Sequence, residues 1–296
     1  MKNPLLHRFS QLVSLLLGAR IFVLLFFTFA LYVSTFFLFN QEESLHNFVF
    51  DYKVHGIIFC AVLSVAAGGI INRFYDRDKD KVSRPFRSRL QSFLNERYFL
   101  YSYLLLNSFS LIISAILSWR ILVFFLIYQF FIWFYSHKLS KILIINNLTF
   151  VSLSLYPFFG MLVYYKHFSY KLLLMAAFLF LIMLIIDLIK DLLTLHVDRI
   201  FGYQTIANVF GLKTSYLVIG VVIFVNAMVS LLIVDFLPQF NYLSWYFSLS
   251  IVFLVFMTFP ILTFQKNKLF WIINFFRIWV FVGVVFMLLN GIFEKF

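Results

Sequence analysis

Three polar residues spaced four apart follow an apolar run of membrane length in the stretch "NRFYDRDKD": Asn72, Asp76 and Asp80. Residues at this spacing share one face of a helix, whereas Asp78 between them points elsewhere. Carboxylates stacked in this way repel one another unless a cation lies between them. Oxygen ligands of this kind suit Mg²⁺, which proteins commonly hold with one or two carboxylates and the phosphates of a substrate. The spacing therefore predicts that Asn72, Asp76 and Asp80 bind Mg²⁺ and a phosphorylated substrate.

A second acidic cluster lies in "DLIKDLLTLHVDRIFG", which begins directly after the apolar run "MAAFLFLIMLII". Asp187, Asp191 and Asp198 lie on one helix face, with Thr194 between them, provided that the helix continues beyond the apolar run. Ionisable groups at membrane depth are unfavourable and usually line a pathway or a site, so we predict that these three aspartates also bind metal. Basic side chains near the clusters are expected to bind the phosphate oxygens, namely Arg84, Arg87, Lys138, Lys141 and Lys190.

Two other interpretations of the acidic residues compete with a metal site. Acidic and basic residues alternate between positions 76 and 81, which is also typical of a solvated surface with many salt bridges. Acidic residues in membrane helices also serve cation-coupled transporters, where they tend to lie near the bilayer midplane beside broken helices. Both clusters here lie at the inner ends of apolar runs, which favours a phosphorylated partner that arrives from the cytoplasm.

The elements that carry these residues are predicted to be membrane-spanning helices. The chain has 296 residues, of which 63% are hydrophobic, and a mean hydropathy of +0.97, so a soluble protein is excluded. Lipid gives the backbone no hydrogen-bonding partners, and the apolar runs are too long for barrel strands, so each span must be a helix. We predict one all-α, polytopic membrane domain over residues 1–296. Its nine transmembrane helices are expected at about 15–38, 54–72, 98–117, 120–137, 142–165, 171–190, 214–235, 242–264 and 270–291.

The basic residues are distributed unevenly between the two sides of these spans. With the N-terminus inside, 18 of the 24 Lys and Arg residues fall in inner segments, eight of them in 73–97. The positive-inside rule then places both acidic clusters in the cytoplasm and the C-terminus outside. Topology and anionic lipid explain the net charge of +12 better than nucleic acid does. The predicted location is a bacterial inner membrane. The chain has a single cysteine, Cys60, which excludes an intrachain disulfide and a metal cluster held by cysteines.

The residues around both clusters resemble the motifs of the UbiA superfamily of intramembrane prenyltransferases. The first family motif, Asn-Asp-x-x-Asp-x-x-x-Asp followed by Arg-Pro, is similar to "NRFYDRDKDKVSRPFR", with Arg73 in place of its first Asp. The second, Lys-Asp-x-x-Asp-x-x-x-Asp-x-x-x-Gly, is similar to "KDLLTLHVDRIFG", with Thr194 in place of its middle Asp. Between them, "FYSHKLSK" is similar to the family's Tyr-Ser-x-x-Leu-Lys loop, with Ser140 where Lys is usual. We expect either that Asp187, one turn before Asp191, substitutes for the missing carboxylate or that the metal site is weaker.

The resemblance covers nearly the whole chain and implies the nine-helix fold of that family. It implies that the protein binds a prenyl diphosphate through Mg²⁺ and, after ionisation of the allylic diphosphate, transfers the prenyl chain to a hydrophobic or aromatic acceptor in the bilayer. The expected catalytic residues are Asn72, Asp76, Asp80, Asp191 and Asp198. An aromatic or quinone-precursor acceptor is the first expectation and a glycerol-phosphate lipid acceptor the second. A cation-coupled transporter is the alternative from a different class of protein.

Polar residues at two other positions each have two interpretations. Asn146 and Asn147 open the fifth predicted span, where relatives often carry a polar residue near the acceptor, but they also suit a helix cap. Arg277 lies too deep in the last span to reach the membrane surface easily, so it is expected either to contact an acid, diphosphate or acceptor carboxylate, or to bond a helix carbonyl.

Overall fold

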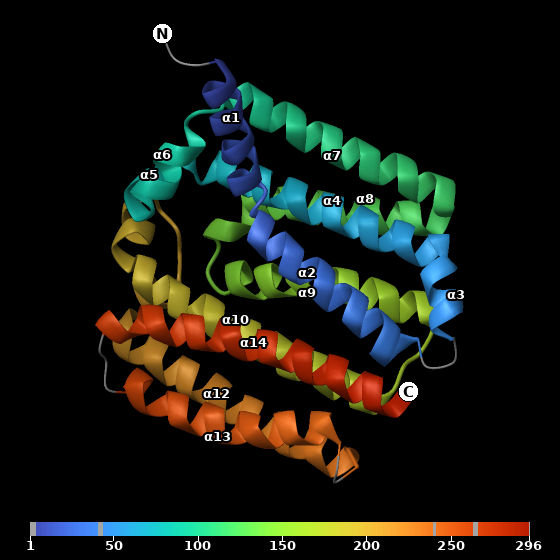
Figure 1. Cartoon of the computed structure of the whole chain (residues 1–296). Coiled ribbons are helices and arrows are strands. Elements are labelled where there is room, and N and C mark those ends of the chain that lie inside the picture. Colours follow the sequence, from blue (N-terminus) through green and yellow to red (C-terminus); the bar gives the residue numbers. More distant parts are fainter. Residues whose placement is uncertain (1–3, 41–43, 239–240, 263–265, 296) are drawn as a thin grey trace. The chain divides into compact units, whose positions relative to one another are not determined.

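The computed structural model describes residues 4–40, 44–238, 241–262 and 266–295, and these ranges form a series of helices (Figure 1). Within the described ranges, nine helical segments are long and apolar enough to cross a membrane. These segments are Ile21–Phe39, Tyr52–Tyr75, Glu96–Leu117, Trp119–His137, Ile145–Tyr165, Tyr170–Ile200, Gly211–Phe236, Tyr242–Ile261 and Lys268–Glu294. The prediction of an all-α, polytopic membrane protein is confirmed.

Shorter helices connect or precede several of the spans. In chain order, the helical elements are α1 (Pro4–Gly18), α2 (Ile21–Ser34), the π-helix η1 (Thr35–Phe39), α3 (Leu45–Phe50), α4 (Tyr52–Tyr75), α5 (Arg77–Ser83), α6 (Pro85–Gln91), α7 (Glu96–Leu117), α8 (Trp119–His137), the 3₁₀-helix η2 (Leu139–Lys141), α9 (Ile145–Tyr165), α10 (Tyr170–Ile200), α11 (Ile206–Val209), α12 (Gly211–Phe236), α13 (Tyr242–Leu262) and α14 (Lys266–Lys295).

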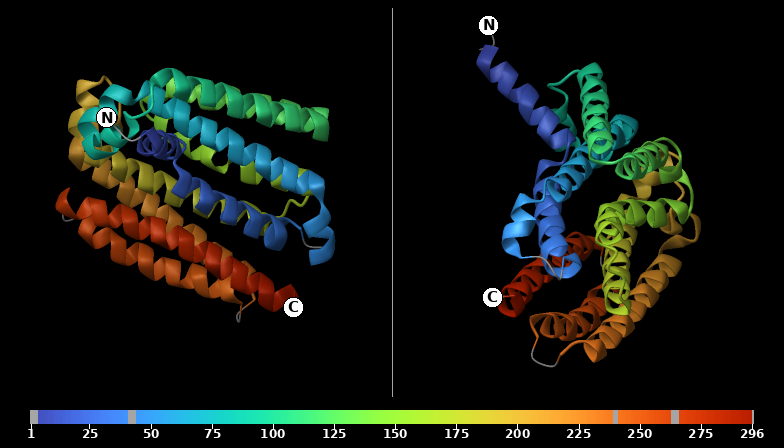
Figure 2. Two further views of the ribbon diagram at one scale, coloured as in Figure 1. Left: turned by 45° about the horizontal axis from the view of Figure 1, so that its top comes forward. Right: turned by 90° about the vertical axis from the view of Figure 1, so that its right-hand side faces the viewer.

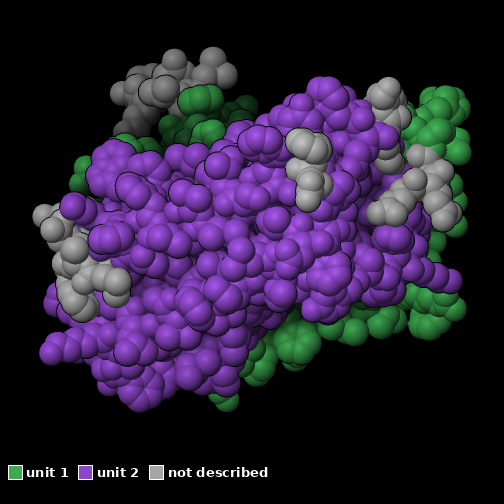
Figure 3. Space-filling view, turned by 90° about the horizontal axis from the view of Figure 1, so that it is seen from below, with its two compact units in different colours: residues 1–32, 42–140 green, residues 33–41, 141–296 purple. Residues whose placement is uncertain are grey.

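The chain divides into two compact units, which Figure 3 shows in different colours. The first unit comprises residues 1–32 and 42–140, and the second comprises residues 33–41 and 141–296. The first acidic cluster lies in the first unit, and the second acidic cluster lies in the second unit. A single domain over residues 1–296 stays a prediction.

Helix α4, which leads into the first acidic cluster, packs against α7 and α8 within the first unit. Small residues let these helices approach closely, since a Cβ placed on Gly56 would lie only 2.7 Å from the Leu117 side chain. Buried polar groups link the three helices. The hydroxyls of Ser64 and Ser110 lie 3.0 Å apart, and Gln129 Nε2 donates to Ser64 Oγ at 3.2 Å.

Helix α10, which carries the second acidic cluster, packs against α9, α12 and α14 within the second unit. The yellow, orange and red helices α10, α12, α13 and α14 lie side by side in Figures 1 and 2. The side chains of Ile182, Ile185 and Ile189 on α10 are fully buried in the core of this unit. Their spacing of three and four residues gives α10 one apolar face. The helix itself continues past its predicted end at residue 190, to Ile200.

Two other segments differ in detail from the predicted elements. The predicted span 15–38 begins too early, because α1 ends at Gly18 and the spanning helix starts only at Ile21. Arg20, between these helices, has a φ of 57°, which an α-helix does not accommodate. The long inner segment 73–97 forms two short helices, and Pro85 begins the second of them, a position where its missing N–H leaves no bond unmade.

Candidate active site

Asn72 and Asp76 lie next to each other at the C-terminal end of α4, as predicted. Asn72 belongs to the last turn of α4, and Asp76 is the residue between α4 and α5. The backbone N–H of Asp76 donates to the Asn72 carbonyl at 2.9 Å, and that of Asp80 donates to the Asp76 carbonyl at 2.8 Å. The helical register therefore continues across the junction, and the three residues occupy successive turns. Asn72 Nδ2 also donates to Asp76 Oδ2 at 2.8 Å.

Asp78 points away from this cluster into solvent, as predicted. Lys81 Nζ donates to Asp78 Oδ1 at 2.7 Å, and this hydrogen bond lowers the pKa of Asp78. Arg77 Nη1 donates to Glu96 Oε2 at 2.7 Å. The alternating run thus does form a salt-bridged surface, in which Asp78 and Glu96 take part, and Asn72 also bonds to Asp76.

A group of arginines accompanies the first acidic cluster. Burial lowers the pKa of Arg20, the nearby Arg84 lowers it further, and the carboxylates of Asp80 and Asp76 raise it. Burial likewise lowers the pKa of Arg87, followed by repulsion from Arg20 and Arg84. Guanidinium groups beside carboxylates suit a ligand that carries several negative charges and also binds a metal, as a diphosphate does.

Arg20 is the member of this group that the sequence interpretation missed. From the sequence, Arg20 is only one of the basic residues that are expected on the inner side. No motif marks the position, and the only signal is a charged residue at the edge of an apolar run. A non-glycine residue with positive φ costs about 1–3 kcal/mol, and such strain clusters at functional sites. The backbone strain and the charged neighbours together make Arg20 a candidate ligand for a phosphate group.

The second acidic cluster is buried on α10. Asp187, Asp191 and Asp198 are 1%, 4% and 1% exposed. Asn147 on the neighbouring helix α9 connects two of them, because its Nδ2 donates to Asp187 Oδ2 and to Asp191 Oδ2, each at 2.8 Å. Lys190 Nζ forms a salt bridge with Asp187 Oδ1 and lies 3.7 Å from Asp191 Oδ1. Both oxygens of Asp187 therefore have partners within the protein.

Thr194 lies on the same face of α10 as these aspartates, as predicted. Its hydroxyl lies 2.6 Å from Asp198 Oδ2, to which it can donate its single hydrogen, and 3.1 Å from the carbonyl oxygen of Lys190. Because α10 extends to Ile200, Asp198 lies on the same helix as Asp187 and Asp191. The prediction required the helix to continue beyond the apolar run, and it does so.

The donor atoms of both clusters fit Mg²⁺. They are carboxylate and amide oxygens, which this hard cation prefers. The Oδ1 atom of Asn147 is buried without a hydrogen-bond partner, and an acceptor left in this state costs about 1–3 kcal/mol. Among the described residues, no three His, Cys, Asp or Glu side chains are grouped so that they alone could hold a metal.

Two of the predicted phosphate ligands, Lys138 and Lys141, lie exposed in the segment between α8 and α9. The ammonium of Lys141 lies over the Tyr203 ring, 5.5 Å from its centroid, and the Lys141 carbonyl accepts a bond from the Gln204 N–H at 3.1 Å. These contacts tie the segment before α9 to the segment after α10. A phosphate-binding role for Lys138 and Lys141 stays a prediction.

The sequence profile of the UbiA prenyltransferase family matches residues 46–281, a range that includes both acidic clusters. The chain belongs to this family. The predicted resemblance is therefore confirmed.

Curated relatives in the UbiA prenyltransferase family include two archaeal digeranylgeranylglyceryl phosphate synthases. The protein from Pyrococcus furiosus is 26% identical over 184 residues, which cover 62% of this chain and 66% of the relative. The protein from Thermococcus sibiricus is 26% identical over 183 residues, which cover 61% of this chain and 64% of the relative. The match thus spans slightly less than two thirds of each relative.

Solved structures of UbiA proteins have the same fold. A digeranylgeranylglyceryl phosphate synthase superposes with a TM-score of 0.72 at 16% identity and covers 95% of this chain and 99% of its own. A UbiA homologue from Archaeoglobus fulgidus, solved with GPP and Mg²⁺ bound, superposes with a TM-score of 0.70 at 14% identity and covers 94% and 99%. A UbiA homologue from Aeropyrum pernix gives 0.68 at 13% identity and covers 92% and 98%.

Arg73 stands where the UbiA motif has an aspartate, and its side chain turns away from Asn72 and Asp76. It is buried, Nη2 donates to the Gln91 carbonyl at 3.1 Å, and the guanidinium carbon lies 3.7 Å from the centroid of the Phe99 ring. Position 73 therefore packs the end of α4 against the start of α7.

The polar residues with two interpretations resolve differently. Asn147 does not cap α9 with its side chain, because its amide bonds to α10, and Ile144 makes no side-chain cap either. Arg277 lies exposed on α14 and donates from Nη1 to Asn274 Oδ1 at 3.4 Å. Both interpretations of Arg277 stay predictions.

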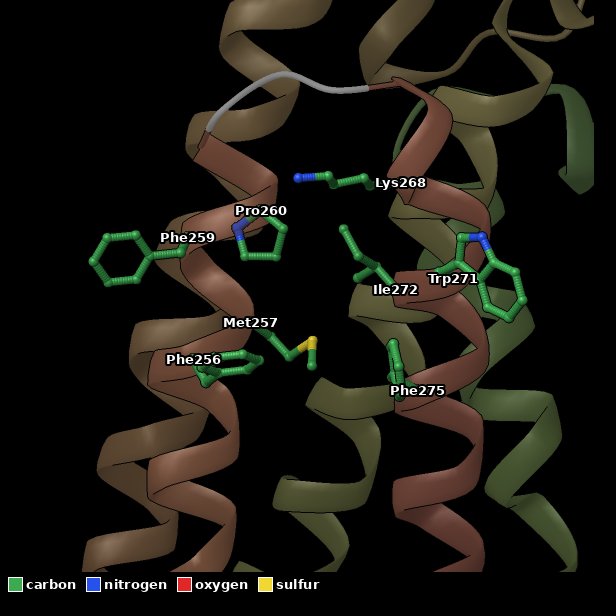
Figure 4. Close-up of a pocket in the computed structure, with 8 residues that line it drawn as sticks. All are labelled: Phe256, Met257, Phe259, Pro260, Lys268, Trp271, Ile272 and Phe275. Carbon is green, nitrogen blue, oxygen red and sulfur yellow. The ribbon is translucent and has the colours of Figure 1, made fainter.

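An apolar groove of about 370 Å³ lies between α13 and α14 in the second unit (Figure 4). The ammonium of Lys268 points from α14 towards α13 at one end of it. The residues that line the groove are Phe256, Met257, Phe259, Pro260, Lys268, Trp271, Ile272 and Phe275. None of these eight is acidic, so the groove lacks the ligands that a Mg²⁺-bound diphosphate requires.

Proposed function

We propose that this protein is a Mg²⁺-dependent prenyltransferase that moves a prenyl chain from a prenyl diphosphate to an acceptor within the membrane. The observation that carries the proposal is the UbiA family match over residues 46–281, which includes both acidic clusters. Each cluster joins aspartates to an asparagine amide at 2.8 Å. This donor chemistry supports the assignment of Asn72, Asp76, Asp80, Asp187, Asp191 and Asp198 as metal ligands.

The chain's own residues would assist departure of the diphosphate. The bond between the allylic carbon and the diphosphate oxygen breaks, and its electron pair leaves with the diphosphate. Arg20, Arg84 and Arg87 stabilise the negative charge that develops there. The acceptor hydroxyl then attacks the allylic cation, and the released diphosphate takes up its proton. Mg²⁺, when bound, supplies further positive charge to the leaving group.

The acceptor that we propose is a glycerol-phosphate lipid, such as a prenylglyceryl phosphate. Support comes from the relatives that match this chain, of which two curated proteins and one solved structure are digeranylgeranylglyceryl phosphate synthases. The order of expectations from the sequence therefore changes, because an aromatic or quinone-precursor acceptor was placed first. No described contact favours the aromatic acceptor, and the short motifs concern only the diphosphate.

Transfer assays on the full chain in lipid nanodiscs test this function. Labelled geranylgeranyl diphosphate and geranylgeranylglyceryl phosphate should give a doubly prenylated lipid with Mg²⁺, none with EDTA, and product again after Mg²⁺ is restored. Asp80→Asn should lower the rate by about a hundredfold or more, as loss of a metal ligand removes several kcal/mol of transition-state stabilisation. The matched control Asp78→Asn should keep the rate, since Asp78 is on the solvent side.

Two results would contradict the proposal. If product formed only from an aromatic acid, such as 4-hydroxybenzoate, the glycerol-phosphate acceptor would be refuted. The assignment of the protein as a prenyltransferase would still hold. Failure with every acceptor, together with cation flux through the protein in liposomes, would identify a transporter instead.

A further inference from the structure

We propose that the carboxamide oxygen of Asn147 is a ligand for the divalent cation of the second acidic cluster, an inference that rests on the proposed function. Asn147 lies on α9, a helix that carries no acidic residue, so neither the acidic motif nor its spacing includes it. The residue is 2% exposed and faces Asp187 and Asp191 on α10.

The orientation of the Asn147 amide follows from its two partners. A carboxylate only accepts hydrogen bonds, so the amide must turn its NH₂ group towards Asp187 Oδ2 and Asp191 Oδ2. The NH₂ group has two hydrogens, and each carboxylate receives one at 2.8 Å. Oδ1 is then the free end of the amide, and it is buried without a hydrogen-bond partner. A purely structural bridge between the carboxylates would leave this acceptor unsatisfied, whereas a cation would satisfy it.

The charges around Asn147 also favour a cation. Asp187, Asp191 and Asp198 supply three carboxylates on one helix, while Lys190 supplies one ammonium, so the four groups have a formal excess of two negative charges. Burial makes this excess unfavourable, since charges removed from water need partners of opposite sign. A single divalent ion matches it in charge.

The first acidic cluster contains the same combination of groups within one stretch of chain. There Asn72 Nδ2 donates to Asp76 Oδ2 at 2.8 Å. Helix α10 contains no asparagine, so the second cluster obtains its amide from α9. The backbone before Asn147 is strained as well. Ile144 has a φ of 65° and forms the centre of a γ-turn closed by the Ile145 N–H and the Leu143 carbonyl at 2.7 Å. A β-branched residue rarely adopts this conformation, which fits a turn retained because it directs the first turn of α9.

Mn²⁺ binding followed by electron paramagnetic resonance tests the ligand role without turnover. The full chain in nanodiscs carries Asp76→Asn and Asp80→Asn as background, so that the signal reports the second cluster. In that background, Asn147→Ala should weaken Mn²⁺ binding by about tenfold or more, the range seen when groups that bind or orient a metal are lost. Asn147→Asp should bind Mn²⁺ within about threefold of the background protein, since a carboxylate oxygen replaces the amide oxygen. Both variants should melt at lower temperature in EDTA, because both lose the NH₂ donor.

A matched control is Asn226→Ala. Asn226 is also a fully buried asparagine, but it lies on α12, a helix that does not carry the second acidic cluster. It should leave Mn²⁺ affinity unchanged. Unchanged affinity in Asn147→Ala would overturn the inference. An equal loss in Asn147→Ala and Asn147→Asp would also overturn it, because the NH₂ group, and not the oxygen, would then be what matters. The proposed function would instead be refuted if the protein without the background substitutions bound no Mn²⁺, whether or not a prenyl diphosphate was present.

Discussion

The hydroxyl of Thr194 donates a hydrogen bond of 2.6 Å to Asp198 Oδ2, one helical turn further along α10. The family motif that this segment resembles has an aspartate at the position of Thr194, and a carboxylate there would repel Asp198 in the absence of metal. In this chain the threonine hydroxyl supports the carboxylate of Asp198, and the Lys190 carbonyl oxygen lies 3.1 Å from the same hydroxyl. Thr194 is therefore a positioning residue for Asp198.

Removal of the Thr194 hydroxyl should impair turnover more than folding. We expect Thr194→Val to lower kcat for prenyl transfer by about tenfold, because a hydrogen bond to a charged group contributes about 1.5–3 kcal/mol and each 1.36 kcal/mol corresponds to a factor of ten. Thr194→Ser keeps the hydroxyl and should retain most of the rate. Steady-state kinetics over a Mg²⁺ titration measure both. Equal rates for the valine and serine variants would show that the bond to Asp198 has no role in catalysis.

Asp187 should be as important as Asp191 if it substitutes for the missing carboxylate at position 194. We expect Asp187→Asn and Asp191→Asn each to lower turnover by about a hundredfold or more, because each removes a charged metal ligand. Thr194→Asp should partly restore activity to Asp187→Asn. Near-normal activity of Asp187→Asn beside an inactive Asp191→Asn would mean that Asp187 serves only its bonds to Lys190 and Asn147.

Restoration of the family's acid at position 73 should destabilise this protein. In Arg73→Asp, a carboxylate would be buried where the guanidinium now lies over the Phe99 ring, and we expect a loss of about 3 kcal/mol or more in unfolding free energy. Arg73→Met keeps the apolar contact with Phe99 and should be milder. Unfolding of the purified variants in mixed micelles compares the two. An aspartate variant as stable as the starting protein would show that position 73 can turn towards the acidic cluster.

Arg20 allows the strain of the backbone to be separated from the charge of the side chain. Arg20→Gly and Arg20→Ala both remove the guanidinium, so both should raise KM for the prenyl diphosphate by about tenfold, the effect of one lost charge-assisted bond. Only glycine relieves the positive φ, so Arg20→Gly should be more stable than Arg20→Ala by about 1 kcal/mol. Steady-state kinetics measure the change in KM, and thermal melting measures the difference in stability. An unchanged KM in both variants would remove Arg20 from the diphosphate site.

The orientation in the membrane stays a proposal, and cysteine labelling in intact cells or sealed vesicles tests it. The native Cys60 is fully buried, so it should not compete for the reagent. Two exposed positions, Ser92 after α6 and Lys166 after α9, are predicted to lie on opposite sides of the membrane. We expect Ser92→Cys to react only from the cytoplasmic side and Lys166→Cys only from the other side. Labelling of Ser92→Cys from outside would reverse the topology and the side of both acidic clusters.

The sequence by itself determined the helical spans and the two acidic faces. Both follow from local rules, because about 20 apolar residues are needed to cross the bilayer and residues four apart share a helix face. Asn72 and Asp76 accordingly lie together, and Asp198 lies on the same helix as Asp187. The break before Ile21 was not predicted, because the apolar pattern runs through it and a single strained residue interrupts the helix.

Only the tertiary structure decided which side chains meet across helices. Asn147 and Asp187 are 40 residues apart, and no periodicity relates positions on two different helices. Arg73 and Phe99 also lie on two different helices, and so no periodicity predicts their contact. Periodicity likewise does not predict the electrostatic interaction between Arg20 and Asp80. These contacts depend on how helices rotate and slide as their faces pack, and the close approach of α4 to its neighbours is set by small residues whose effect is not local. The acids were therefore visible in the sequence, while the amide and the arginine that complete their surroundings became apparent only from the packed helices.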